Sequence, residues 1–408
     1  MRAPAVRLAT IVVALSVVTI SQPARATAAM TPGPIALGVL TDDSGPSAGA
    51  GVPRTTATRL FFSGLNADGG VHGREVALTV RDHQSDPALA RRHYEEIRHD
   101  VLMIQRLQGT PILRELMPLI REDRMPASPG ARVSSLASEA SLIMSGASYR
   151  SEMLNAVEYV ATFLRAPPGT RIAAVVQDDE FGWDGMAGVD EGAARHGFEI
   201  AAAVSYAPGA TDYTPQIAAL RRSGAEYVFL AVTTRATGAL VGGSVKEGFT
   251  PTFFGSAHAL EPALFDADPS LRSAFEGRWF TSSPFAYWGE PVPGMDAMIR
   301  AVRRSAPKQP PNTFFVQGWL QARLVAEVLD RAADRGDLSR RGMLRALDTI
   351  TDEDFDGLCA PLTYTESHRI PTARTRVLQL VFDDARYPGL LKPVSGYYSA
   401  RTRRPAAP

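Results

Sequence analysis

The stretch Val101-Leu102-Met103-Ile104-Gln105-Arg106-Leu107-Gln108-Gly109-Thr110-Pro111 indicates how this chain folds. Five of the seven residues from 101 to 107 are apolar, which predicts a buried strand. Gly109 then ends the strand. Thr110-Pro111 predicts the start of a helix, because proline is favoured in a first helical turn. A strand that leads through a short glycine turn into a helix is the unit from which parallel sheets are built.

The same alternation of strands and helices extends in both directions from this unit. Further strands are predicted at 35–40, 76–80, 172–176, 227–232 and 253–254, and later ones at 362–364 and 377–382. Helices are predicted at 57–66, 152–164, 184–196, 214–223, 238–247, 294–305, 313–333 and 339–350. The pattern starts afresh after residue 150, and 408 residues exceed what one compact core holds. The predicted fold class is therefore α/β, with two units of parallel sheet.

The charge balance gives no reason to expect nucleic acid as a partner. The chain carries 43 Lys and Arg residues and 43 Asp and Glu residues, so its formal net charge is zero. Nucleic-acid binding depends on a positive surface that neutralises phosphates. No nucleic-acid partner is expected.

The N-terminus predicts export. Arg2 and Arg7 precede an apolar run at 8–20, and small residues follow up to Ala26. This order is typical of a cleavable secretory signal peptide, predicted over 1–26, with an uncleaved anchor as the alternative. Cys359 is the single cysteine, so no internal disulfide forms and no cysteine follows the signal to carry a lipid. The periplasm is the expected location, and a lipoprotein is not expected.

Several stretches together resemble one family: IALGVL at 35–40, LNADGGVHGR at 65–74, VRDHQSDP at 80–87, YAPGATDY at 206–213 and FDGLCAPLTY at 355–364. They resemble the type I periplasmic solute-binding proteins of ABC importers, of the branched-chain-amino-acid-binding (leucine/isoleucine/valine-binding-like) family. The resemblance implies two doubly wound lobes joined by three crossover segments, near 144–148, 281–285 and 357–364. It divides the chain into a first lobe of 31–145 plus 284–356, a second lobe of 146–283 plus 357–400, and a tail at 401–408.

Two loops of the first lobe are candidate ligand contacts. Ligands of open parallel sheets bind beyond the carboxyl ends of the strands. Gln108, Gly109 and Thr110 follow a strand, and the free N–H groups of the next helix favour an anionic oxygen. The Thr110 hydroxyl has two interpretations, as a ligand contact or as a cap of its own helix. By resemblance, backbone N–H and hydroxyl groups hold a carboxylate at this position.

The segment Ser128-Pro129-Gly130-Ala131-Arg132 resembles a family segment, Ser-Pro-Ala-Ala-Thr, that also contacts a carboxylate. Gly130 and Ala131 are therefore candidate contacts. Arg132 departs from the family pattern. If it points inward, its guanidinium can clamp a carboxylate through two N–H bonds; if it points outward, it is a solvated surface arginine.

The second lobe contributes five further candidates. Phe181 takes the position of a family aromatic over the ligand, with a core phenylalanine as the alternative, and Trp183 is a second apolar candidate. Thr233 replaces a frequent aromatic. Ala257 stands where family members that hold an ammonium commonly have glutamate. His258 is either a pocket residue or a structural histidine.

The missing glutamate shapes the expected ligand. An unpaired buried ammonium is costly, so an ordinary α-amino acid is not favoured. We expect a small carboxylate-bearing or neutral polar molecule with an apolar body.

The predicted function is the extracytoplasmic solute-binding subunit of an ABC importer, which closes its two lobes on the ligand and engages a membrane permease. The alternative is a ligand-sensing receptor that reports to a signalling partner. No nucleotide-binding glycine loop and no Gly-x-Ser-x-Gly elbow occurs, so an enzyme is not expected. The histidines are scattered and the acidic run 178–180 is interpreted as a solvated loop, so neither a metal nor a cofactor is expected. A monomer is expected.

Overall fold

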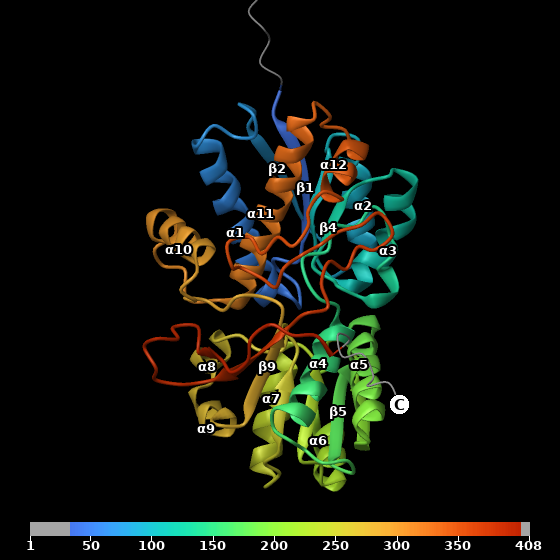
Figure 1. Ribbon diagram of the computed structural model, residues 1–408, viewed down its shortest axis with the longest axis vertical. Coiled ribbons are helices and arrows are strands. Elements are labelled where there is room, and N and C mark those ends of the chain that lie inside the picture. The colour runs from blue at the N-terminus through green and yellow to red at the C-terminus, as the bar shows by residue number, and fades with distance from the viewer. Residues whose placement is uncertain (1–32, 401–408) are drawn as a thin grey trace, which may run out of the picture. The chain divides into compact units, whose positions relative to one another are not determined.

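The computed structural model describes residues 33–400 (Figure 1). The predicted signal peptide at 1–26 and the predicted tail at 401–408 lie outside the described residues. None of the helices in the described part of the chain is long and apolar enough to cross a membrane.

The first lobe is built on a four-stranded sheet in the order β2-β1-β3-β4. All neighbouring strands are parallel. The strands are β1 (Ile35–Thr41), β2 (Val76–Asp82), β3 (Met103–Leu107) and β4 (Ala127–Pro129). Because the strands are parallel, their carboxyl ends and the loops that follow them meet at one edge of the sheet.

Helices cover both faces of this sheet (Figure 1). Successive strand residues point to opposite faces, and the neighbours Met103 and Ile104 belong to different cores. The Met103 core includes the side chains of α1 (Ala48–Ala67), α10 (Pro293–Ser305), α11 (Thr313–Asp334) and α12 (Arg340–Leu347). The Ile104 core includes those of α2 (Pro87–Ile97) and α3 (Thr110–Glu122).

The second lobe is built on a seven-stranded sheet in the order β11-β10-β9-β8-β7-β5-β6. The strands are β5 (Arg171–Gln177), β6 (Glu199–Tyr206), β7 (Tyr227–Ala231), β8 (Thr252–Gly255), β9 (Trp279–Ser283), β10 (Arg376–Leu380) and β11 (Leu391–Pro393). The strands from β5 to β9 run parallel, whereas β10 pairs antiparallel with both β9 and β11. The two final strands extend the sheet by an antiparallel edge.

This sheet is also covered on both faces. Ala173 and Val175 pack with α6 (Thr214–Ser223) and α7 (Thr234–Lys246), whereas Ala174 and Val176 pack with α4 (Tyr149–Thr162) and α5 (Glu180–His196). Short helices α8 (Ala263–Ala267) and α9 (Arg272–Phe275) and 3-10 turns at Ser134–Leu136 and Pro269–Leu271 complete the fold. The predicted α/β class with two doubly wound lobes is confirmed.

The segments between the lobes run close together. The Tyr364 hydroxyl donates to Met144 O, Ala360 N donates to Pro284 O at 2.7 Å, and Ala286 N donates to Leu358 O at 2.8 Å. The stretch after residue 364 still contacts the first lobe, because Arg369 N donates to Ala137 O at 2.6 Å. These contacts favour a third crossing later than the predicted 357–364. The boundaries of the lobes stay a prediction.

One amide of α4 fastens the end of the described chain. Asn155 Nδ2 donates to Ala373 O and to Thr375 Oγ1, both at 2.9 Å, and Asn155 Oδ1 accepts from Ala400 N at 2.9 Å. The Tyr398 hydroxyl donates to Asn155 O at 2.6 Å. A single buried side chain thus joins α4 to the segment before β10 and to the segment after β11.

Two predicted elements differ most from the structure. Helix α1 begins at Ala48 rather than at 57, so the glycine- and proline-containing residues ahead of the predicted start also belong to the helix. Gly51 makes this possible, since a Cβ there would lie 1.7 Å from Asp42 O. Residues 362–364 form no strand; Leu362 makes only an isolated bridge with Glu353.

The packing of α4 against α5 yields a stability prediction. A Cβ at Gly188 of α5 would lie 2.2 Å from the backbone oxygen of Arg150, which cannot move without moving α4. Gly188→Ala should lower the free energy of unfolding by about 1–3 kcal/mol. Gly64→Ala in α1, where nothing lies within 4 Å of the added Cβ, should leave it unchanged or raise it by up to about 1 kcal/mol. Urea denaturation measures both; equal stability of the two variants would contradict this packing.

Candidate ligand-binding site

Arg132 and Glu152 form a buried ion pair between the two lobes. Arg132 follows β4 and is 2% exposed, and Glu152, in the first turn of α4, is fully buried. Arg132 Nη2 donates to Glu152 Oε1 at 2.5 Å, and Arg132 Nε donates to Ala147 O at 2.8 Å. The Arg132 side chain therefore points inward, and the outward alternative is wrong. Its guanidinium is already bound by a carboxylate of the protein.

The second oxygen of Glu152 reaches another loop. Glu152 Oε2 accepts a hydrogen bond from Ala257 N at 2.9 Å, in the loop that follows β8. Burial raises the pKa of Glu152, while the positive charge of Arg132 and the two hydrogen bonds act in the opposite direction. The carboxylate that Ala257 lacks is thus supplied by α4, but it is engaged by Arg132 and a backbone N–H.

Arg54 of α1 is a buried cation without a carboxylate bound to it. Its Nη2 atom donates to Gln317 Oε1 at 2.5 Å and lies 3.0 Å from His258 Nε2. The guanidinium carbon lies 4.6 Å from the centre of the Phe314 ring. Among residues 33–400, no acidic side chain forms an ion pair with Arg54. Burial and the charge of Arg132 lower the pKa of Arg54 to about 10.

His258 is held neutral by its surroundings. Burial, Arg132 and Arg54 lower the pKa of His258 well below its ordinary value. Since arginine only donates, Nε2 is the acceptor from Arg54 and the ring proton sits on Nδ1. Within the described chain, His258 Nδ1 is buried and has no hydrogen-bond partner. A buried donor without an acceptor is costly, so a ligand acceptor would be favoured there.

Aromatic rings surround these polar groups. The centre of the Phe181 ring lies 4.7 Å from the centre of the Tyr149 ring and 5.9 Å from that of His258. Phe181 is 7% exposed. The centre of the Phe285 ring lies 4.9 Å from the guanidinium carbon of Arg132. Phe181 therefore lies against the candidate site while it also packs in the core of the first lobe. Its two interpretations coexist.

Glu261, in the loop before α8, places a buried carboxyl group against the first residues of α11. It accepts hydrogen bonds from Thr313 N at 3.1 Å and Phe314 N at 2.9 Å. Burial raises the pKa of Glu261 to about 8, although these N–H groups and Arg54 favour the ionised form. Glu261 forms no ion pair with Arg54 in the described chain, because its oxygens are taken up by the backbone N–H groups at the start of α11.

The charges of this cluster do not balance. Arg132 is neutralised by Glu152, whereas Arg54 forms no ion pair and is hydrogen-bonded to the uncharged side chains of Gln317 and His258. A further buried arginine, Arg106 at the end of β3, is 1% exposed, and burial lowers its pKa to about 9. The cluster therefore holds more positive than negative charge and offers hydrogen-bond donors to a ligand. Both features suit an anionic ligand that carries oxygen atoms.

The candidates after β3 have other contacts. Gln108 Oε1 accepts from Arg106 Nη2 at 3.2 Å, so this side chain helps to hold the buried arginine. Gly109 has a positive φ of 96° and is the N-cap of α3, which begins at Thr110. No side chain caps this helix, so the capping alternative for Thr110 is wrong.

The candidates after β4 lie beside Arg54 and Arg132. Gly130 O accepts from Arg132 Nη1 at 3.4 Å, and a Cβ at Gly130 would lie 3.9 Å from Arg54 Nη1. Ala131 is buried. This loop therefore reaches the same cluster, and its contact with a ligand stays a prediction.

Two candidates lie apart from the cluster. Trp183 is 49% exposed and its indole N–H donates to Asp178 Oδ1 at 3.0 Å. Thr233 is exposed at the N-terminus of α7, and its backbone N–H donates to the Tyr206 hydroxyl at 3.3 Å. Neither side chain contacts the buried groups described above.

Sequence reasoning missed Arg54, Glu152, Tyr149 and Gln317. Arg54 escaped because α1 was expected to start later. Glu152 stands in the first helical turn after the first crossing, a position that helix dipoles favour for an acidic side chain. That position was a usable signal for a residue between the lobes.

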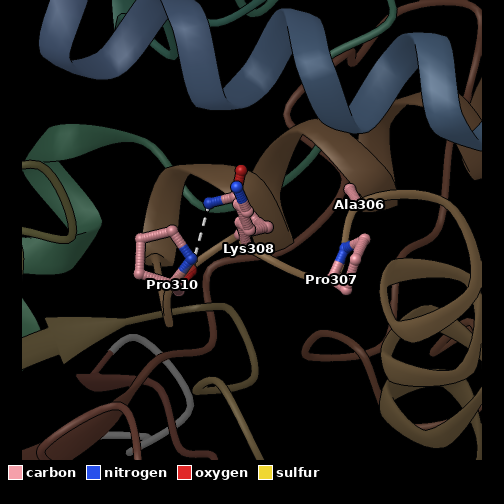
Figure 2. A pocket seen from close by; sticks show the side chains of 5 residues that line it. Ala306, Pro307, Lys308 and Pro310 are labelled. Carbon is pink, nitrogen blue, oxygen red and sulfur yellow. Dashed lines mark hydrogen bonds between the residues drawn. The ribbon is translucent and has the colours of Figure 1, made fainter.

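Two cavities of the structure lie away from this cluster. One, of about 520 Å³, is lined by Ala306–Pro310 in the loop between α10 and α11, where Gln309 Nε2 donates to Pro310 O at 3.0 Å (Figure 2). The other, of about 480 Å³, is lined by residues from α8, α9, the same loop and the stretch before β11. Five consecutive loop residues supply no charge pattern that selects a ligand, so the site is assigned to the buried cluster.

Two α/β lobes with a polar, aromatic-walled cluster between strand ends define a class of ligand-binding proteins. Comparison with known proteins agrees. The periplasmic binding protein family matches residues 34–385, and the chain belongs to this family. None of the curated proteins matches it.

Solved structures share the fold. A fatty acid ABC transporter substrate-binding protein from Thermomonospora curvata is 26% identical, with a TM-score of 0.84 over 91% of this chain and 93% of its own. A branched chain amino acid ABC transporter from Thermus thermophilus with bound valine is 21% identical, with a TM-score of 0.79 over 90% and 97%. The protein is thus a solute-binding protein of an extracytoplasmic family.

The raised pKa of Glu261 predicts a pH-dependent stability. The unfolded chain deprotonates this carboxyl near pH 4.5 and the folded protein near pH 8. Between these values the folded state binds more protons, so this group lowers stability as pH rises. Glu261→Gln should remove this effect. Relative to the variant, the wild type should lose on the order of 3 kcal/mol of unfolding free energy from pH 5 to pH 8.

Urea denaturation at several pH values measures the difference. The depressed pKa of His258 acts with the opposite sign at acidic pH, but it is common to both proteins and cancels. A pH-independent difference between wild type and Glu261→Gln would contradict the raised pKa.

Proposed function

We propose that this protein is the extracytoplasmic solute-binding subunit of an ABC importer and that it captures a carboxylate with an apolar body. The single observation that carries the proposal is the buried Arg54 guanidinium, which is hydrogen-bonded only to neutral side chains. A carboxylate would supply the missing counter-charge and accept from His258 Nδ1.

The chemistry of the walls supports an apolar body. Phe181, Tyr149 and Phe314 surround the polar groups and offer ring faces and edges rather than hydrogen bonds. The acidic partner that an α-amino group requires is not available, since Glu152 is bound by Arg132 and by Ala257 N. A ligand ammonium near Arg54 would also be repelled by its charge.

The comparison with solved proteins supports the same class. The Thermomonospora curvata protein, 26% identical over most of both chains, is described as a fatty acid transporter substrate-binding protein. A fatty acid has the carboxylate head and apolar tail that the cluster around Arg54 suits. The Thermus thermophilus protein holds valine, and at 21% identity its likeness supports the fold alone.

The remaining parts of the proposal follow from the fold. Contacts such as those between Arg54 and His258, and between Arg114 and Glu180, join first-lobe helices to the second lobe. Separation of the lobes would break them and admit the solute, and closure would restore them and exclude water. We propose that a membrane permease recognises the closed form, that a cleavable signal peptide exports the protein to the periplasm, and that it catalyses no reaction.

The ligand class is tested with matched compounds. Aliphatic carboxylates such as hexanoate and octanoate should raise the melting temperature more than valine or leucine, because a ligand that binds only the folded state stabilises it. The corresponding amides, which lack the charge, should have a smaller effect. Thermal-shift measurements followed by calorimetry give the order. A larger shift with valine than with any carboxylate would overturn the proposed ligand class.

The role of Arg54 is tested in the same assay. Arg54→Gln should weaken binding of the best carboxylate by roughly a hundredfold, since a buried charged hydrogen bond is lost. The fold should persist, because no carboxylate is left without a partner. Arg59→Gln, on the exposed side of the same helix, is the matched control and should bind as the wild type does. Equal affinity of both variants would place the ligand elsewhere.

A further inference from the structure

A second group of ligand-capable side chains lies on the surface of the first lobe. His72, in the turn between α1 and β2, faces Asp330 and Asp334 of α11. One ligand atom from each residue lies within 4.8 Å of the others. No other group of three such side chains occurs among residues 33–400. The two aspartates are four residues apart, which places them on one face of the helix.

The distances match the edges of a metal coordination shell. His72 Nε2 lies 3.3 Å from Asp330 Oδ1 and 3.3 Å from Asp334 Oδ1. Zinc bonds nitrogen and oxygen at about 2.0–2.2 Å in a tetrahedron, and neighbouring ligand atoms of such a tetrahedron are about 3.3 Å apart. Both measured separations equal that edge.

The orientation of the imidazole points in the same direction. His93 Nδ1 lies at the same 3.3 Å from Glu96 Oε2, and that contact is a hydrogen bond. Neither contact of His72 is a hydrogen bond in the described part of the chain. Neither carboxylate oxygen therefore lies on the line of a ring N–H. The other ligands of a metal also lie off the line of the nitrogen lone pair, because the ion occupies that line.

The charges of the site call for a cation. Among the described residues, Asp330 and Asp334 form ion pairs with His72 alone. The nearby Arg331 is directed elsewhere, since its Nε donates to Glu327 Oε1 at 2.6 Å and its Nη1 to Thr349 O at 2.7 Å. Two like charges four residues apart on a helix repel each other. A divalent cation would remove this repulsion.

We propose that His72, Asp330 and Asp334 bind a divalent metal ion of the zinc type, with water in the fourth position. One imidazole and two carboxylates suit Zn²⁺, Co²⁺ or Ni²⁺ better than Ca²⁺ or Mg²⁺, which prefer oxygen ligands alone. The ion would fasten the turn around His72 to α11. The site is distinct from the Arg54 cluster and does not depend on the proposed ligand.

Titration of the untagged full chain with Zn²⁺ and Co²⁺ tests the proposal. Calorimetry should show one Zn²⁺ per chain, and bound Co²⁺ should give the visible absorption of a four-coordinate ion. Zn²⁺ should raise the melting temperature and a chelator should reverse the rise. Absence of stoichiometric Zn²⁺ binding would overturn the proposal and leave the contacts as an ion pair.

Three variants locate the ion. His72→Asn keeps a residue that tolerates the positive φ of 48° at this position but removes the imidazole. This variant and Asp330→Asn should each bind Zn²⁺ roughly tenfold more weakly or worse. His93→Asn, which removes a half-buried histidine beside a single carboxylate, should bind as the wild type does. Binding that survives His72→Asn or falls equally in His93→Asn would contradict this site.

Discussion

The carboxylate of Glu152 joins three parts of the chain that are far apart in sequence. One oxygen is bound by Arg132 from the loop after β4, and the other by the backbone N–H of Ala257 from the loop after β8. Glu152 itself stands at the start of α4, directly after the first crossing. All three groups are buried. Because a buried charge is stable only when it is paired and hydrogen-bonded, neither Arg132 nor Glu152 can be replaced alone without cost.

This pair determines what the neighbouring groups offer a ligand. With Arg132 neutralised, the positive charge without an ion pair belongs to Arg54 and to Arg106 at the end of β3. With Glu152 engaged, no carboxylate remains for an ammonium. Burial and the charges of Arg132 and Arg54 lower the pKa of His258, and its Nδ1 atom has no hydrogen-bond partner in the described chain. The selectivity proposed for the site therefore depends on the pairing of Arg132 with Glu152.

The fold was largely predictable from the sequence because alternating strands and helices leave a local pattern. The strand at 35–40 and the glycine turn at 108–109 were placed correctly from composition alone. The start of α1 was not, because Gly51 permits a close approach to Asp42 that only the tertiary structure reveals. Arg54 was hidden by that error. Glu152 was hidden because its two partners come from loops 20 and 105 residues away.

The surface group at His72 was missed for the same physical reason. His72 is separated from Asp330 and Asp334 by more than 250 residues, and so long a separation leaves no pattern in a single sequence. By contrast, Trp183 was predicted from its residue type as a second apolar candidate, but it stands on α5 with its side chain 49% exposed. Residue type predicted which side chains could bind a ligand. Only the packing of the folded chain determines which of them lie close together.

The hydrogen bonds between Asn155 and the end of the described chain have a consequence for how the protein can be handled and processed. Because this residue binds both the segment before β10 and Ala400, the last described residues are part of the second lobe's core and not an appendage. Cleavage by a protease ahead of Tyr398 would uncover a buried amide and loosen α4, the helix that carries Glu152. An affinity tag or a fluorescent fusion partner should accordingly be joined beyond Ala400, where it would leave these bonds intact.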